Sequence, residues 1–312
     1  MNSFLIAITV VCPLLIYMMV GAGIQKLGIM SKENFKALNT MIFKIFIPLG
    51  VFFDIYETNL GDVLQIEVFV FAFVGILMTY LIGWGLITKA VKENDYATVM
   101  IQGLYRSNYA LFGISIAKSI CDSEGVALTA ALSAMVVPMF NILAVILFEV
   151  KRGGEIKIGR VLINIMKNPL VVAGILGGIF AATGIRIPEL ITTPLQKLGS
   201  TATPIALVTL GGLLSKESVA RHRKYLMITV LGRLVIVPAI ALGTAILLGM
   251  RGNPLVTLLA VFGSPTAVSS APMAQTMGGN GELAGEIVAS TSVCCIITVF
   301  LFVFTMSQMG WI

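Results

Sequence analysis

Polar and charged side chains interrupt two long apolar stretches of this 312-residue sequence. The first stretch, residues 101–118, contains Arg106, Ser107 and Asn108 about midway along its length. Such groups are expensive in hydrocarbon, so they normally face the protein interior or a water-filled cavity and mark a site. Two interrupted hydrophobic segments in corresponding halves of a chain are the pattern expected around the binding site of a transporter. The second stretch, residues 260–276, supplies the matching polar centre: Ser264, Pro265, Thr266 and Ser269.

The chemistry that these residues favour is the binding of an anion. At a broken helix, the half-helix after the break presents free N–H groups and the positive end of its dipole. An arginine adds a planar cation whose donors match a carboxylate. Arg106 is therefore expected to bind a small carboxylate; the alternatives are that it caps backbone carbonyls or pairs with an acid. The other polar residues bond either the substrate or backbone groups freed by the break: Ser107, Asn108, Ser264, Thr266 and Ser269. Asn141, after Pro138, either lines the same cavity or bonds to a neighbouring helix.

The composition indicates that membrane helices position these side chains. Hydrophobic residues make up 57% of the chain and charged residues only 12%, against about 25% charged in soluble domains. The mean hydropathy is +0.98. A spanning helix needs about 20 mostly apolar residues. The expected fold is therefore an all-α polytopic membrane protein. Ten segments meet this length: 4–24, 34–56, 67–89, 95–119, 125–149, 161–183, 194–215, 225–249, 254–277 and 284–307.

The distribution of basic residues predicts the orientation of these spans. Of the 21 lysines and arginines, 14 fall at loops on one side of the ten-span plan and four on the other. Because cytoplasmic loops carry the excess of Lys and Arg, both termini are expected outside the cytoplasm, in a multi-pass protein of the cytoplasmic membrane. The basic residues of these loops account for the net charge of +6. Because membrane topology explains this charge, we exclude nucleic acid as a partner.

Ten spans divide into two five-helix repeats, residues 1–152 and 153–312. An odd number of spans per half places the halves in opposite orientations, the inverted repeat of many carriers. Broken fourth and ninth spans would then cross at the midplane, and scaffold and transport parts would be drawn from both repeats. Three pairs of residues at similar places in the two halves are separated by 156–158 positions: Pro48 and Pro204, Asn108 and Pro265, and Glu124 and Glu282.

Other motifs argue against an enzyme or an ATP-driven pump. The sequence has no phosphate-binding Gly-x-x-x-x-Gly-Lys-Ser/Thr loop and no His-Glu-x-x-His motif, and no cofactor or metal is expected. His222, in a run of basic residues, is expected to be solvated. Lys44 and Arg233 are expected to extend toward the membrane interface. The acids Asp54 and Glu286 fall toward span ends, so no coupling carboxylate is predicted.

Several motifs resemble the auxin efflux carrier family of bacteria, over essentially the whole chain. They are residues 106–113 (RSNYALFG), 264–268 (SPTAV), 271–274 (APMA) and 137–143 (VPMFNIL), together with Arg233 and Pro238. The resemblance implies two inverted five-helix repeats and an anion bound where the fourth and ninth spans cross. Plant members export auxin, and bacterial relatives are associated with malate and malonate. Ser115 stands where members of the family often have proline, which questions a sharp kink in the fourth span.

Together, these observations predict a secondary carrier of a small organic anion, either a malate- or malonate-like dicarboxylate or an auxin-like monocarboxylate. Alternating access would move a unit that carries Arg106, Asn108, Ser264 and Thr266 against the scaffold. An organic-anion channel and a sodium-coupled symporter of the bile-acid type are the alternatives. The expected partners are the anion and the lipid bilayer, and a homodimer is one of the oligomeric states left open.

Overall fold

The computed structural model describes residues 2–57, 65–151, 159, 163 and 166–312. The boundary between the two predicted repeats lies outside the described residues, and so do residues 161, 162, 164 and 165 at the start of the sixth predicted span. So do three basic residues on which the orientation argument drew: Arg152, Lys157 and Arg160.

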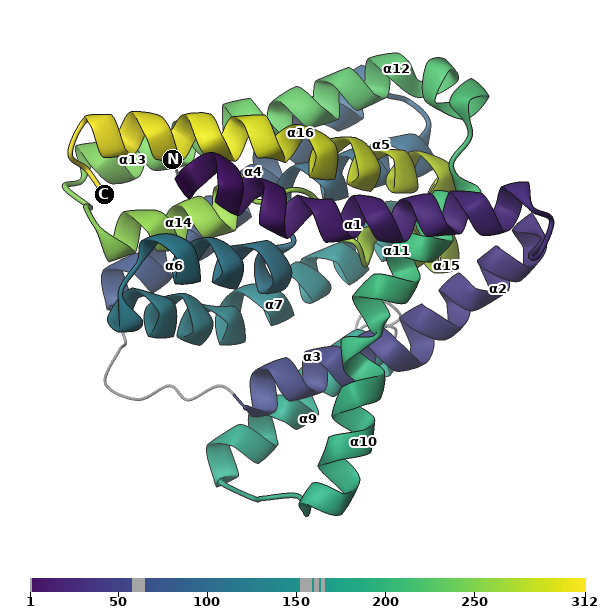
Figure 1. The fold of residues 1–312 in the computed structure, drawn as a ribbon, viewed down its shortest axis with the longest axis horizontal. Helices are drawn as coiled ribbons and strands as arrows, with labels where there is room; N and C mark the ends of the chain where they lie inside the picture. Colours follow the sequence, from purple (N-terminus) through teal and green to yellow (C-terminus); the bar gives the residue numbers. More distant parts are fainter. Residues whose placement is uncertain (1, 58–64, 152–158, 160–162, 164–165) are drawn as a thin grey trace.

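Helices account for the regular structure of the described residues (Figure 1). In the first half they are α1 (Asn2–Lys26), α2 (Lys32–Met41), η1 (Ile42–Phe46), α3 (Ile47–Tyr56), α4 (Ile66–Ala90), α5 (Asn94–Tyr105), η2 (Tyr109–Gly113), α6 (Ile114–Ile120) and α7 (Ser123–Lys151). In the second half they are α9 (Pro169–Thr183), α10 (Glu189–Ser200), α11 (Ala202–Leu213), α12 (Lys216–Leu231), η3 (Gly232–Ile236), α13 (Val237–Leu247), α14 (Asn253–Gly263), α15 (Ser270–Met277) and α16 (Gly281–Gln308).

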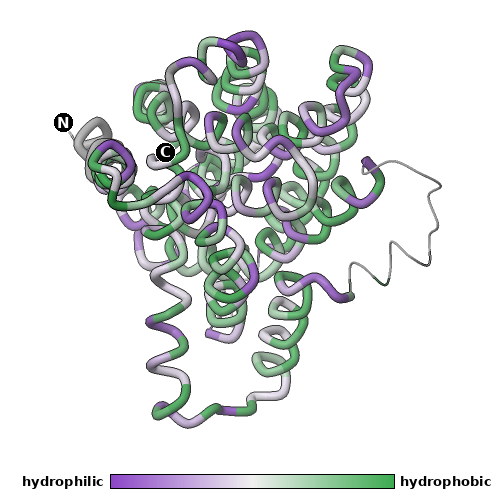
Figure 2. Tube along the Cα trace, turned by 90° about the vertical axis from the view of Figure 1, so that its right-hand side faces the viewer, coloured by the Kyte–Doolittle hydropathy of each residue, from purple (hydrophilic) through white to green (hydrophobic). Residues whose placement is uncertain are grey.

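Five continuous helices of the described chain are long and apolar enough to cross a membrane: Lys32–Tyr56, Ile66–Ala90, Ser123–Lys151, Glu217–Leu247 and Gly281–Gln308. Shorter apolar helices accompany them. The prediction of an all-helical membrane protein is thereby confirmed, whereas the arrangement of ten spans as an inverted repeat stays a prediction. Figure 2 shows hydrophobic residues along most of the helices.

Two of the long helices contain a single wide turn just before a proline. The π-helical turn η1 precedes Pro48, and the turn η3 precedes Pro238. Proline has no N–H to donate, and its ring clashes with the carbonyl four residues earlier. A wider turn relieves that clash without ending the helix. Arg233 lies within η3, and the turn brings its side chain into the protein interior, where only 1% of its surface is exposed.

Close contact between backbones holds α1 against α11. A Cβ atom added to Gly211 would overlap the carbonyl oxygen of Met18, and one added to Gly21 would overlap that of Val208. In lipid the helices gain little from hiding apolar surface from each other, so small residues that allow close packing stabilise their association. In Figure 1, α3, α9 and α10 extend away from the larger group of helices that contains α5, α14 and α16.

Candidate functional site

Two helices stop in the interior of the protein, at the two polar stretches of the sequence. The helix α5 ends at Tyr105, and helical structure resumes with η2 at Tyr109. In the second half α14 ends at Gly263, and α15 begins at Ser270. The first break is complete although Ser115 replaces the family's proline, since Arg106 has extended backbone angles (φ −85°, ψ 100°).

The two breaks pair with each other through backbone hydrogen bonds. The N–H of Asn108 donates to the carbonyl oxygen of Pro265 at 2.8 Å, and the N–H of Ala267 donates to that of Arg106 at 3.1 Å. These bonds form an isolated antiparallel bridge between Ser107 and Thr266. Non-helical backbone at membrane depth must find such partners because lipid offers none. Each break therefore satisfies part of the backbone that the other exposes.

Arg233 holds the helix ends that precede the breaks. Its Nε and Nη2 donate to the carbonyl oxygen of Ser264 at 2.9 and 2.7 Å, its Nη1 to that of Leu104 at 3.0 Å, and its Nη2 to that of Val261 at 2.9 Å. The last carbonyls of a helix lack helical partners and carry partial negative charge. The prediction that Arg233 extends toward the membrane interface is therefore wrong: these carbonyls satisfy its guanidinium inside the protein.

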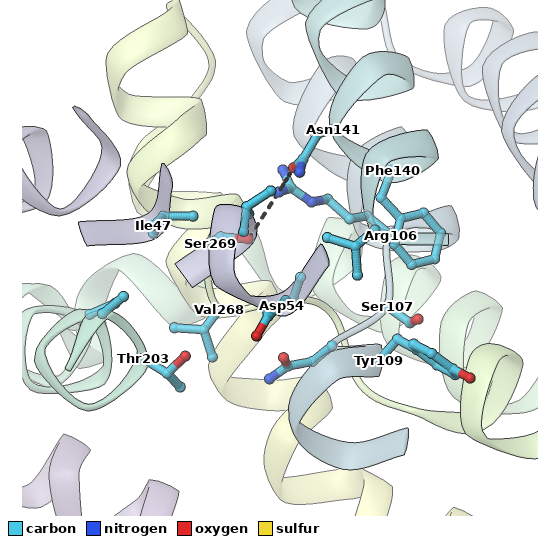
Figure 3. A pocket seen from close by; sticks show the side chains of 16 residues that line it. Ile47, Asp54, Arg106, Ser107, Tyr109, Phe140, Asn141, Thr203, Val268 and Ser269 are labelled. Carbon is cyan, nitrogen blue, oxygen red and sulfur yellow. Dashed lines mark hydrogen bonds between the residues drawn. The ribbon is translucent and has the colours of Figure 1, made fainter. Parts of the chain in front are cut away.

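Arg106 makes a different set of contacts. Its Nη2 donates to Oδ1 of Asn141 at 2.7 Å and to Oγ of Ser269 at 3.0 Å, and its Nη1 approaches Sδ of Met273 at 2.7 Å. Figure 3 shows the side chains of Arg106, Asn141 and Ser269 together, with Asp54 of α3 nearby. Only 3% of the Arg106 surface is exposed. Because the three accepting groups are uncharged, none of them neutralises the guanidinium.

Several buried polar atoms beside Arg106 have no hydrogen-bond partner among the described residues. They are Oγ of Ser107, Nδ2 of Asn108 and Nδ2 of Asn141. A buried donor left unpaired costs about 1–3 kcal/mol, and proteins rarely retain such groups without a reason. Two amide donors and a hydroxyl next to a buried cation are the groups that a carboxylate would satisfy.

A cavity of about 120 Å³ joins these groups to the neighbouring helices. Both breaks line it, and so do α3, α7 and α11. Apolar side chains of Ile47, Val51 and Phe140 form part of the wall, and Thr203 and Asp54 add polar groups. A small, mostly apolar cavity with a few polar groups converging in it is typical of a small-molecule site.

Five of the eight residues predicted for the site line this cavity: Arg106, Ser107, Asn108, Asn141 and Ser269. The other three lie at the second break but bond elsewhere. The hydroxyl of Ser264 donates to the carbonyl oxygen of Ala260 at 2.6 Å, and that of Thr266 to the carbonyl oxygen of Gly103 at 2.9 Å. Pro265 contributes the backbone oxygen that pairs the breaks.

Sequence reasoning missed two side chains of the site and left a third unassigned. Nothing in the sequence marks Thr203, because a single threonine in an apolar helix is ordinary packing material. Met273 lies in the APMA motif, but the motif does not indicate that its sulfur contacts Arg106, since a methionine usually fills space in a core. Asp54 is visible in the sequence as an acid within a span, but its place toward the span end predicts no role in the site. Its position on the cavity wall depends on how α3 packs, which the sequence of α3 alone does not reveal.

A second buried polar group lies away from the cavity and corrects the prediction for His222. Its Nδ1 lies 2.8 Å from Oε2 of Glu286, and its Nε2 lies 3.2 Å from the hydroxyl of Tyr96. Ser218 donates to the other oxygen of Glu286. Only 1% of the surface of His222 and none of that of Glu286 is exposed. The expectation of a solvated His222 is wrong because α12 turns this position toward α16, where Glu286 pairs with it.

Comparison with known proteins supports the prediction that this chain is a membrane transporter. The sequence matches the family described as membrane transport protein over residues 6–303, which is nearly the whole chain. It is also similar to an uncharacterized transporter of Methanocaldococcus jannaschii, with 26% identity over 321 residues covering 99% of each chain. Both are transporters and not enzymes, as the sequence predicted.

Proposed function

The chain belongs to the auxin efflux carrier-like family of membrane transport proteins, and from this premise we propose that it is a secondary carrier of a small organic anion in the cytoplasmic membrane. The substrate is a malate- or malonate-like dicarboxylate or an auxin-like monocarboxylate. One observation carries the proposal: Arg106 is buried with uncharged partners, beside unpaired amide donors of Asn108 and Asn141.

A carboxylate in the cavity would complete the hydrogen bonding of this group. The guanidinium of Arg106 supplies charge and direction, and the amide nitrogens of Asn108 and Asn141 supply further donors. The carboxylate of Asp54 adds negative charge to the same cavity. The anion is therefore expected to bind on the Arg106 side, with its apolar or second acidic part extending away from Asp54.

The transport step is alternating access. In this proposal the chain forms two inverted five-helix repeats, and its fourth and ninth spans cross where the two breaks pair. The unit that contains the breaks moves as one body because backbone bonds between Asn108 and Pro265, and the capping bonds of Arg233, tie its halves together. Movement of this unit against α1, α3 and α11 would expose the anion to one side of the membrane at a time.

Counterflow in proteoliposomes tests the proposal. Vesicles that contain the purified protein are loaded with unlabelled malate, and entry of labelled malate is followed with malonate and indole-3-acetate as competitors. The expected result is saturable exchange that does not need sodium. Unitary currents in a bilayer recording would instead indicate a channel, and sodium-dependent uptake a symporter of the bile-acid type. Absence of exchange with any of these acids would contradict the substrate class.

A further inference from the structure

A second, larger cavity of about 520 Å³ lies along the same group of helices. The two cavities border the same two elements through neighbouring residues. In α11, Ala206 lines the first cavity and Leu210 the second, and these residues are one helical turn apart. At the second break and α15, Ser269 lines the first cavity and Ala271 the second. The second cavity therefore lies next to the first, along α11 on one side and the second break and α15 on the other.

The second cavity contains a buried amide with an unpaired atom. Asn39 of α2 is only 4% exposed, and its Nδ2 donates to Oε1 of Gln275 in α15 at 2.9 Å. Gln275 in turn donates to the carbonyl oxygen of Lys36 at 3.0 Å. Oδ1 of Asn39 has no partner among the described residues. An unpaired buried acceptor on a cavity wall indicates a ligand that donates a hydrogen bond there.

The charged side chains of this cavity favour an anion. Lys32 and Lys36 of α2 line it, together with the acids Asp95 and Glu282. Glu282 is already paired with Arg221, whose Nη2 lies 3.3 Å from its Oε2. Because the charge of Arg221 offsets that of Glu282, two lysines remain in the cavity against one acid, Asp95. Lys32 and Lys36 also belong to the side of the molecule that the distribution of basic residues predicts to be cytoplasmic.

We propose that the second cavity is a docking site for a hydroxyl-bearing carboxylate, from which the anion passes to the site at Arg106. Lys32 and Lys36 attract the carboxylate, and Oδ1 of Asn39 accepts a hydrogen bond from the hydroxyl group. The hydrogen bond between Asn39 and Gln275 links α2 to α15 at the wall of the second cavity. The inference rests on the proposed carrier function and narrows its substrates to hydroxy acids.

Transport kinetics test the role of the lysines. Lys32→Gln/Lys36→Gln is expected to raise the KM for malate about fivefold with little change in the maximal rate, the size typical of exposed charge interactions. Lys89→Gln/Lys92→Gln removes the same charge on the same predicted side but changes neither cavity wall, so its KM is expected to stay unchanged. Equal KM values for the two double variants would overturn the docking site.

Competition between malate and succinate, which lacks the hydroxyl, tests Asn39. The wild type is expected to favour malate several-fold, and Asn39→Ala is expected to lose that preference. Gln275→Ala breaks the same bond between helices but keeps Oδ1 of Asn39, so it is expected to keep the preference. A preference that survives in Asn39→Ala would overturn the assignment.

Binding of labelled malate to purified Arg106→Gln separates this inference from the proposed function. The docking site is expected to retain weak binding in that variant, and adding Lys32→Gln/Lys36→Gln is expected to abolish it. Complete loss of binding in Arg106→Gln alone would overturn the docking site while supporting the central one. Lysine-dependent binding without any exchange by the wild type would refute the carrier function and leave the docking site standing.

Discussion

At the scale of single residues, the sequence allowed two roles for Arg106: binding an anion or capping backbone carbonyls. In the structure two buried arginines, Arg106 and Arg233, make these two kinds of contact separately. Arg233 donates all four of its described hydrogen bonds to main-chain carbonyls of α5 and of the α14 end. Arg106 donates to the side chains of Asn141, Ser269 and Met273. Carbonyls fixed at helix ends need a permanent partner, whereas side chains can rotate to admit a ligand. We therefore propose that Arg233 serves the fold and that Arg106 serves binding.

This division predicts opposite effects of two substitutions. Arg233→Met leaves several buried carbonyls unpaired and is expected to destabilise the protein by about 3 kcal/mol or more, because each charge-assisted bond is worth about 1.5–3 kcal/mol. Arg106→Gln keeps the cavity polar and is expected to change the melting temperature much less. Thermal unfolding of both variants in detergent measures this difference. Similar losses of stability would refute the division of tasks.

Asn108 and Thr266 form a second contrasting pair. Nδ2 of Asn108 has no partner among the described residues, so Asn108→Ala is expected to keep stability. The same substitution is expected to raise the KM for the anion about tenfold, the value of one bond to a charged group. The hydroxyl of Thr266 already bonds to Gly103, so Thr266→Val is expected to lower stability by about 1 kcal/mol and leave KM nearly unchanged. Counterflow kinetics together with thermal unfolding distinguish the two. An unchanged KM in Asn108→Ala would remove that side chain from the site.

At the scale of elements, α1 and α11 meet through glycines, which among the described glycines leave the least room for a side chain. Gly211→Ala would place a methyl group against the carbonyl of Met18, and such overpacking typically costs about 1–3 kcal/mol. Gly243, in α13, has open space at the same atom, so Gly243→Ala is a matched control expected to be neutral or slightly stabilising. Thermal unfolding of the two variants measures the difference. Equal stability would show that α1 and α11 separate more easily than their backbone contact suggests.

The elements also show how much of the structure could be predicted from the sequence. Helices lie at all ten predicted segments, apart from the first part of the sixth, because apolar length and proline or glycine signals are local. The breaks at Arg106 and Ser264 were predicted from polar residues at midspan. The burial of Arg233 and His222 was not, because both depend on partners far away in sequence: Leu104 for the first and Glu286 for the second.

At the scale of the whole molecule, the distribution of basic residues predicts an orientation of the proposed carrier in the membrane. Figure 1 shows the two ends of the chain at the same end of the molecule. In the ten-span prediction each basic loop follows an odd-numbered span, so both termini are expected outside the cytoplasm. An alkaline phosphatase fused after Ile312 is expected to be active and one fused after Leu214 inactive. The reverse pattern would invert the proposed orientation and move the second cavity to the outer face.

We propose that the paired breaks form the functional centre of the whole molecule. Side chains from α3, α7 and α11 meet there with both breaks around one small cavity. The most direct test of the account is binding of labelled malate to the purified wild type and to Arg106→Gln, with Arg251→Gln as a control. Arg251 is exposed and bonds only to the carbonyls of Ile246 and Met250 among the described residues. We predict that tight binding is lost in Arg106→Gln and kept in Arg251→Gln; equal binding by all three proteins would contradict an anion site at the paired breaks.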